Sequence, residues 1–191
     1  ARCGVKTTLL ERFGCFGGNI TVVGVEGFAW YRHEKTVEAG GIGNEFEELA
    51  KEMGAAVPES QSLSYELDSE GFKLVADKLV IDAGIHPMLH RSFSTPIMEG
   101  NTIVGVIVES KAGREAILSK VVIDATGDAD VAFRAGAKLN SMPVEEQMAT
   151  SVMFHLAGVD KKAFLSEIQN NPQSYKDWSD GEWEVETDGK E

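Results

Sequence analysis

A glutamate and a pair of glycines near the start of the chain are the first residues whose types and spacing suggest chemistry. Residues 5–10 are mostly apolar or β-branched, which predicts a strand, and Glu11 follows them directly. An acid that ends the second strand of a βαβ unit accepts hydrogen bonds from the ribose hydroxyls of a bound dinucleotide. Gly17 and Gly18 lie in the loop that follows and would let a bulky ligand approach the backbone. The same pattern is also compatible with a surface acid followed by an ordinary wide turn.

A second motif lies more than a hundred residues further along the chain. Residues 120–127 form a continuous apolar run that ends in small residues, which predicts a buried parallel strand. A helix is expected to begin at once, with Asp128 as its N-cap. Ala125, Thr126 and Gly127 would let a flat or charged group lie on the backbone, and the helix N-terminus would supply free N–H groups. Asp128 could cap this helix, accept a hydrogen bond from a ligand hydroxyl, or do both.

The remaining pattern supplies elements to position these two motifs. Apolar periodicity, glycine terminators and capping residues predict three helices, and short alternating or β-branched runs separated by turn residues predict several strands. The expected helices are 44–54, capped by Asn44, 71–84 and 160–168, capped by Asp160; the expected strands are 85–95, 102–109, 115–119 and 148–156, with a turn at 96–101.

Charge and composition exclude several classes of protein. The chain has 191 residues, 18 of them basic and 31 acidic, so the formal net charge is −13. No basic cluster is present to bind nucleic acid or an anionic membrane surface. No apolar run approaches the roughly 20 residues that span a bilayer. The two cysteines, Cys3 and Cys15, are too few for a disulfide scaffold or a cysteine-based metal site, and reduced thiols in a cytoplasmic protein are the simpler expectation.

The two motifs together resemble one family of enzymes. Residues 9–18 (LLERFGCFGG) and 122–132 (VIDATGDADVA) are similar to FAD-dependent oxidoreductases of the two-dinucleotide-binding-domain flavoprotein class. The similarity is greatest to the branch that resembles heterodisulfide reductase flavin subunits and fumarate-reductase-like flavoproteins, and it covers about residues 2–158. The family's G-x-G-x-x-G turn is missing, and we expect it to lie upstream of Ala1. The family's C-terminal segment, which closes over the flavin, is missing as well.

The resemblance implies a role for each motif residue. Glu11 would bind the adenosine ribose, Arg12 and the turn at 16–18 would lie along the diphosphate and ribityl chain, and residues 125–127 would pass close to the adenine half of FAD. The candidate cofactor-binding residues are therefore Glu11, Arg12, Phe16, Gly17, Gly18, Ala125, Thr126, Gly127 and Asp128.

These observations predict an α/β fold: an incomplete Rossmann-like FAD-binding domain with a parallel sheet and a β-meander hairpin. The domain would comprise residues 1–140 with a helical insertion at about 20–84, and residues 141–191 would begin a substrate-side α+β region. Strands 5–10 and 120–125 should be parallel but not directly paired.

The expected function is that of part of an FAD-dependent oxidoreductase, with a small-molecule substrate and an electron donor or acceptor as partners and possible homo-oligomerisation. The alternatives are an NAD-binding dehydrogenase domain and a non-catalytic interaction module with a degenerate nucleotide-binding fold. No metal site is expected, because His86 and His90 have metal-like spacing without an acid or cysteine nearby to complete a site.

Overall fold

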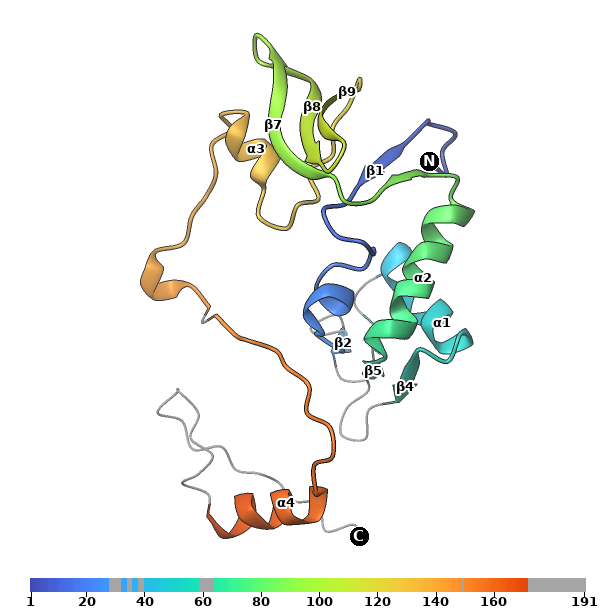
Figure 1. Cartoon of the computed structure of the whole chain (residues 1–191), viewed down its shortest axis with the longest axis vertical. Helices are drawn as coiled ribbons and strands as arrows, with labels where there is room; N and C mark the ends of the chain where they lie inside the picture. The colour runs from blue at the N-terminus through green and yellow to red at the C-terminus, as the bar shows by residue number, and fades with distance from the viewer. Residues whose placement is uncertain (28–31, 34–35, 38–39, 59–63, 149, 172–191) are drawn as a thin grey trace. The chain divides into compact units, whose positions relative to one another are not determined.

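The computed structural model describes residues 1–27, 32–33, 36–37, 40–58, 64–148 and 150–171 (Figure 1). Its contacts divide the chain into two units, Ala1–Met153 and Phe154–Glu191, and each unit is described by itself. The expected boundary at residues 140 and 141 lies before this division. Within the described ranges, no helix is both long enough and apolar enough to cross a bilayer.

A short parallel strand pair carries the first motif. β1 (Thr8–Leu10) pairs with β6 (His86–Met88), with Thr8 opposite His86 and Leu10 opposite Met88. The hydrogen bonding continues beyond both strands, because the Glu11 N–H donates to the Met88 carbonyl at 3.0 Å and the Arg91 N–H donates to the Glu11 carbonyl at 2.9 Å. The predicted parallel sheet is therefore present, and the α/β fold class is confirmed.

A helical segment lies between these two strands in sequence. It begins with a short π-helix, η1 (Asn19–Val23), and its main elements are α1 (Ile42–Glu52) and α2 (Ser69–Asp82). Two small antiparallel pairs accompany them: β2 (Arg32–His33) with β3 (Thr36–Val37), and β4 (Ala56–Pro58) with β5 (Tyr65–Leu67). The core of this segment includes Phe72, Val75, Ala50 and Leu67, all almost fully buried.

Both helices begin slightly earlier than their sequence patterns predict. The N-cap of α1 is Gly41 rather than Asn44, which lies inside the first turn. The N-cap of α2 is Asp68, whose side chain accepts a hydrogen bond from the Glu70 N–H at 3.0 Å. Because Asp68 is the cap, the polar residues Ser69 and Glu70 form the first turn of α2 rather than the end of the preceding loop, and Ser69 is buried there.

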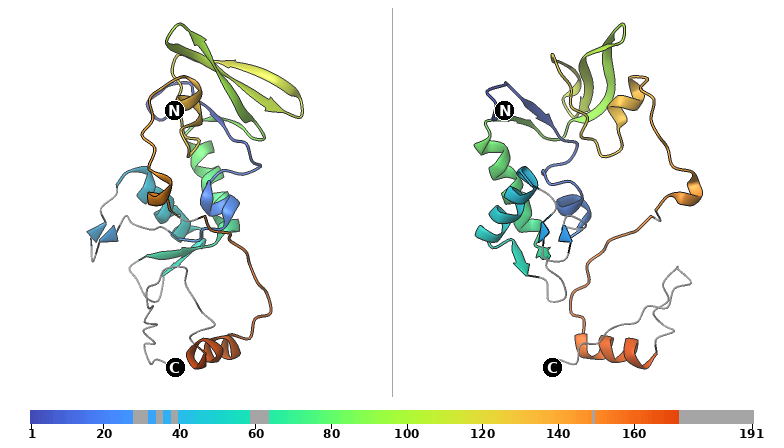
Figure 2. Two further views of the ribbon diagram at one scale, coloured as in Figure 1. Left: turned by 90° about the vertical axis from the view of Figure 1, so that its left-hand side faces the viewer. Right: turned by 180° about the vertical axis from the view of Figure 1, so that it is seen from behind.

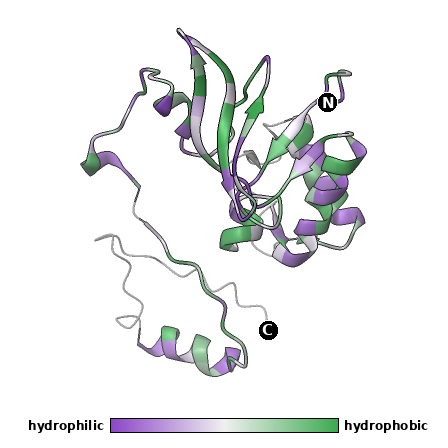
Figure 3. Cartoon of the chain, turned by 45° about the horizontal axis from the view of Figure 1, so that its top comes forward, coloured by the Kyte–Doolittle hydropathy of each residue, from purple (hydrophilic) through white to green (hydrophobic). Residues whose placement is uncertain are grey.

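A three-stranded antiparallel sheet follows, in the order β7 (Ser92–Glu99), β8 (Thr102–Ser110) and β9 (Gly113–Leu118). Figure 2 shows its twist, and Figure 3 shows polar and apolar residues interleaved along its strands. The predicted turn at 96–101 is wrong for most of its length, because β7 continues to Glu99. Pro96 does not end β7, because β7 lies at the edge of its sheet, with β8 as its one partner among the described strands, and an edge strand tolerates a proline.

The predicted strand at residues 120–125 is not formed. Val122 packs against the core cluster of Val106, Val108 and Val131, but Val121 is 75% exposed and Ile123 is 84% exposed. An extended segment becomes a strand only when a neighbouring strand pairs with its N–H and C=O groups, and no such neighbour lies among the described residues. The same reason applies to the predicted strand at 148–156, whose described residues also belong to no sheet.

Three short helices complete the described chain: α3 (Asp130–Arg134), a 3-10 helix η2 (Val144–Glu146) and α4 (Lys161–Asn170). α3 contacts β7, where the Arg134 guanidinium donates to the Ser94 carbonyl at 2.7 Å. The predicted cap of α4 is confirmed, because the Asp160 side chain accepts from the N–H groups of Lys162 and Ala163.

Candidate cofactor site

The Glu11 carboxylate is held in place by its own loop. Its Oε1 accepts a hydrogen bond from the Phe13 N–H at 2.8 Å. The Glu11 backbone is bonded on one side to Met88, the last residue of β6, and on the other to Arg91, which follows β6. In the described part of the chain its Oε2 has no hydrogen-bond partner. Half-buried Glu11 thus presents one oriented acceptor at the end of β1, which is the geometry that a ribose hydroxyl would require.

Arg12 and Phe16 have different environments in the loop. Arg12 is exposed, with its guanidinium carbon 4.6 Å from the centre of the Phe13 ring, so its charge can reach an anionic group. Phe16 is buried in a cluster with Ala76 and Val80. Its ring anchors the loop to α2, so only the backbone of Phe16 can face a ligand.

The two glycines of the loop also differ. Gly17 has φ +114°, and a Cβ there would overlap the Thr21 side chain, whose hydroxyl lies 2.7 Å from that position. Thr21 is buried and its hydroxyl donates to the Phe16 carbonyl at 2.7 Å. Gly18 has φ +57° and open space where a Cβ would lie. Gly17 is therefore required by internal packing, whereas Gly18 leaves the backbone accessible to a ligand.

Asp124 organises the second motif, a role that the sequence patterns did not assign to it. Its Oδ1 accepts from the Thr126 N–H at 3.1 Å and from the Thr126 hydroxyl at 2.8 Å, and its Oδ2 accepts from the Ala132 N–H at 2.9 Å. The Thr126 hydroxyl oxygen in turn accepts from the Asp130 N–H at 3.0 Å. The spacing Asp-x-Thr, in which an aspartate bonds the backbone two residues on, was the available signal.

These bonds change the acidity of Asp124. Burial works to raise its pKa, but the hydrogen bonds from the Ala132 N–H, from the Thr126 hydroxyl and N–H and from the Val131 N–H outweigh burial and lower it. Asp124 is therefore ionised at neutral pH and serves as a fixed acceptor for its own turn.

The predicted N-cap of the following helix is wrong. The cap is Ala129, in the left-handed region at φ 57°, and Asp128 is exposed with no side-chain hydrogen bond to the described chain. α3 is only five residues long, and the N–H groups of Asp130 and Ala132 are already occupied by Thr126 and Asp124. The helix N-terminus is thus satisfied internally, and these donors are not free to bind a ligand.

In the second motif, the backbone near Gly127 and the carboxylate of Asp128 stay accessible. Gly127 has φ +93°, is exposed and has open space where a Cβ would lie. Ala125 and Asp128 are exposed beside it. The roles of the nine candidate residues in cofactor binding stay predictions.

The two motifs approach each other through one hydrophobic cluster. Val106, Val108 and Val131 are its buried members, and Leu10 and Val122 pack against them. Leu10 directly precedes Glu11, while Val122 and Val131 flank the turn that contains Thr126 and Gly127. Segments far apart in sequence are therefore anchored to the same core.

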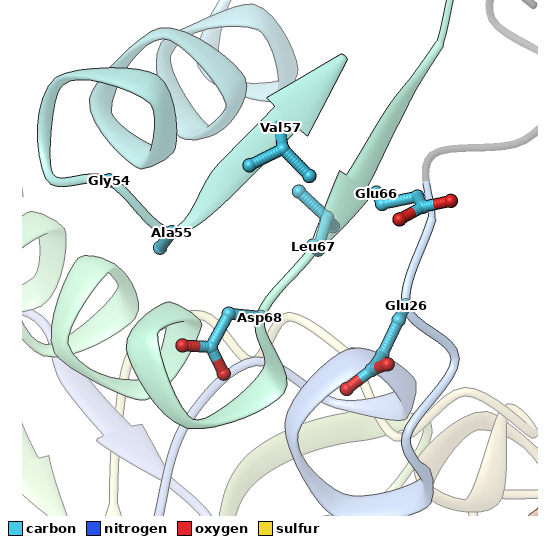
Figure 4. A pocket seen from close by; sticks show the side chains of 7 residues that line it. All are labelled: Glu26, Gly54, Ala55, Val57, Glu66, Leu67 and Asp68. Atoms are coloured by element: carbon cyan, nitrogen blue, oxygen red, sulfur yellow. The ribbon is translucent and has the colours of Figure 1, made fainter. Parts of the chain in front are cut away.

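A hollow in the described chain lies away from both motifs. It has a volume of about 220 Å³ and is lined by Glu26, Gly54, Ala55, Val57, Glu66, Leu67 and Asp68 (Figure 4). It shares no residue with the predicted site, and Asp68 is already the cap of α2. Within the described ranges there is no group of three or more His, Cys, Asp or Glu side chains that could hold a metal ion.

The chain is similar in sequence or in fold to several known proteins. The chain is 30% identical over 155 residues to the thiamine thiazole synthase of Metallosphaera sedula, covering 75% of this chain and 54% of that protein. The crystal structure of Thermovibrio ammonificans THI4 matches with a TM-score of 0.48 and 16% identity, over 70% of this chain and 53% of the other. This chain therefore spans about half the length of each.

A more distant match is the glycerol-3-phosphate dehydrogenase from Bacillus halodurans complexed with FAD, with a TM-score of 0.38 and 15% identity over 61% of this chain and 28% of the other. The family model described as FAD dependent oxidoreductase matches residues 1–191, so the whole chain lies within that match. The chain belongs to the family of FAD dependent oxidoreductases, and its cofactor is FAD, as its two motifs predicted.

Proposed function

We propose that this chain forms the adenosine side of the FAD site in an oxidoreductase that transfers electrons or hydride between a small-molecule substrate and a second electron carrier. The observation that supports this most is the Glu11 carboxylate, which is fixed at the end of β1 by the Phe13 N–H and retains one uncommitted oxygen. Because this acceptor is already fixed, binding a ribose hydroxyl does not cost the free energy of ordering the side chain.

The residues present fit the adenosine and diphosphate groups of FAD. Glu11 accepts hydrogen bonds from ribose hydroxyls, and Arg12 is an exposed cation one residue further on. Gly18 and Gly127 leave space for close approach to the backbone. When bound, FAD supplies the redox chemistry, while the protein supplies binding, orientation and electrostatics. The substrate, the electron partner and any association into homo-oligomers are part of this proposal.

Substitution of Glu11 in the full-length protein tests the proposal. Glu11→Ala removes a charged acceptor, and we expect FAD affinity to fall by about 1.5–3 kcal/mol, measured by titration calorimetry. Glu11→Gln keeps an oxygen that can accept from the Phe13 N–H, so it separates loss of ribose binding from loss of the loop. Glu99→Gln, at the exposed end of β7, is the matched control and should leave FAD affinity unchanged. Unchanged affinity in both Glu11 variants would show that this carboxylate does not bind the ribose.

The alternatives predict different observations. An NAD-binding dehydrogenase would purify without flavin absorbance and bind NAD, and a non-catalytic module would bind neither cofactor tightly. The named relative favours a second candidate function, synthesis of the thiazole of thiamine. Restoration of thiamine-independent growth in a bacterium that lacks its own thiazole synthase would support that candidate, and failure of a well-expressed protein to do so would count against it.

A further inference from the structure

His90 has a left-handed backbone conformation, which residues other than glycine rarely adopt. It lies between β6 and β7 with φ 54°, and among the described residues only Ala129 shares this property outside glycine. Residues kept in such conformations concentrate at functional sites, where the surrounding structure holds them. Here the surrounding structure is the predicted cofactor loop, because the His90 N–H donates to the Phe13 carbonyl at 3.1 Å.

The His90 ring packs against the same loop. A Cβ on Gly14 would lie 2.9 Å from Cε1 and 3.0 Å from Nε2 of His90, so the imidazole covers the position where any larger residue would project. His90 as a whole is nevertheless exposed. The ring is therefore held on the loop three residues after Glu11, with surface left for a ligand.

We propose that the His90 imidazole is a further FAD-binding group, against which the adenine base stacks. This inference rests on the proposed function, because it needs the ribose at Glu11. A base attached to that ribose lies within a few ångströms of it, and nucleobases stack favourably on aromatic side chains. The neighbouring Arg91 N–H donates to the Glu11 carbonyl at 2.9 Å, so the ribose acceptor and the ring are parts of one bonded framework.

His90→Asn is the sharpest test, since asparagine tolerates the left-handed backbone but has no aromatic ring. In the full-length protein we expect roughly 5- to 50-fold weaker binding of both FAD and ADP, with FMN binding unchanged, measured by calorimetry. His86→Asn is the matched control: His86 is also an exposed histidine, in β6, and its substitution should change none of the three affinities.

Two further variants separate ligand binding from support of the fold. His90→Gly relieves the backbone strain, so its thermal unfolding midpoint should rise by a few degrees while FAD affinity falls as in His90→Asn. Gly14→Ala retains His90 but displaces its ring, and it should weaken ADP binding in the parent without weakening it further in the His90→Gly background.

The outcomes distinguish this inference from the proposed function. Weaker ADP binding in Glu11→Gln but parental ADP binding in His90→Asn and His90→Gly would overturn the role of His90 and leave the ribose assignment intact. Parental FAD and ADP binding in all of these variants would overturn both. Equal losses of ADP and FMN affinity in His90→Asn would also overturn the inference, because they would indicate a general disturbance of the site.

Discussion

The two candidate motifs are stabilised in opposite ways. The loop from Glu11 to Gly18 is held mainly by residues outside it. Its backbone is hydrogen-bonded to the end of β6 and the residues that follow, its Phe16 ring packs against α2, and its Phe16 carbonyl accepts from the buried Thr21 hydroxyl. The turn from Asp124 to Ala132 is held by its own side chains, through the bonds of Asp124 and Thr126. The first conformation therefore depends on distant sequence, whereas the second is largely encoded within nine consecutive residues.

Gly17→Ala should have the largest effect on this comparison. The new Cβ would overlap Thr21, and the alanine would have to keep a φ of +114°, which is strained for any residue with a Cβ. We therefore expect the free energy of unfolding to fall by about 2–4 kcal/mol. Gly18→Ala is the control, because it meets no neighbour and should cost only about 1–2 kcal/mol for its positive φ. Urea unfolding measures both. Equal costs would mean that packing against Thr21 does not hold the loop.

Asp124→Ala tests the self-contained turn. It removes the acceptor for the Ala132 N–H and for both donors of Thr126, and we expect unfolding to become easier by about 2–3 kcal/mol. Amide exchange at Ala132 should accelerate, while exchange at His90 in the first motif should not. Asp128→Ala is the matched control, since exposed Asp128 makes no side-chain hydrogen bond within the described chain. A comparable cost for Asp128→Ala would contradict the assignment of Asp124 as the organising residue.

Thr126 should give a smaller effect in the same turn. Thr126→Val keeps the shape but removes the hydroxyl that bonds Asp124 and the Asp130 N–H, at an expected cost of about 1–1.5 kcal/mol. Thr126→Ser keeps the hydroxyl and should remain within about 0.5 kcal/mol of the parent in urea unfolding. If serine were as harmful as valine, the hydroxyl bonds could not be the cause.

The smallest expected effect is the change of unfolding free energy at acid pH that comes from Asp124. The pKa of Asp124 is lowered from 3.8 on folding, so its contribution is complete above about pH 5 and is lost as the pH falls through the lowered folded value. The difference in unfolding free energy between the parent and Asp124→Asn should therefore be constant near neutral pH and should shrink below pH 4. A difference that stays constant down to pH 2 would show that the carboxylate charge is not involved.

Local patterns determined much of this protein by themselves. The apolar stripes predicted the helices α1 and α2 to within a few residues, although the predicted Asn44 cap of α1 is wrong. The Asp160 cap predicted α4, and alternation with a glycine-containing turn predicted the hairpin from Thr102 to Leu118. The two motifs identified the family and its cofactor. These properties depend on residues close together in sequence, and so a sequence pattern is enough to reveal them.

Only the tertiary structure decided which of these residues are buried, which organise a turn and which stay exposed. Phe16 lies in the core, Asp124 rather than Asp128 organises the second turn, and His90 meets Gly14 because β6 pairs with β1. Residues 120–125 have the composition of a buried strand yet form none among the described residues. A strand needs partners for its backbone groups, and which segment supplies them is set by the assembly of the sheet rather than by the segment's own sequence.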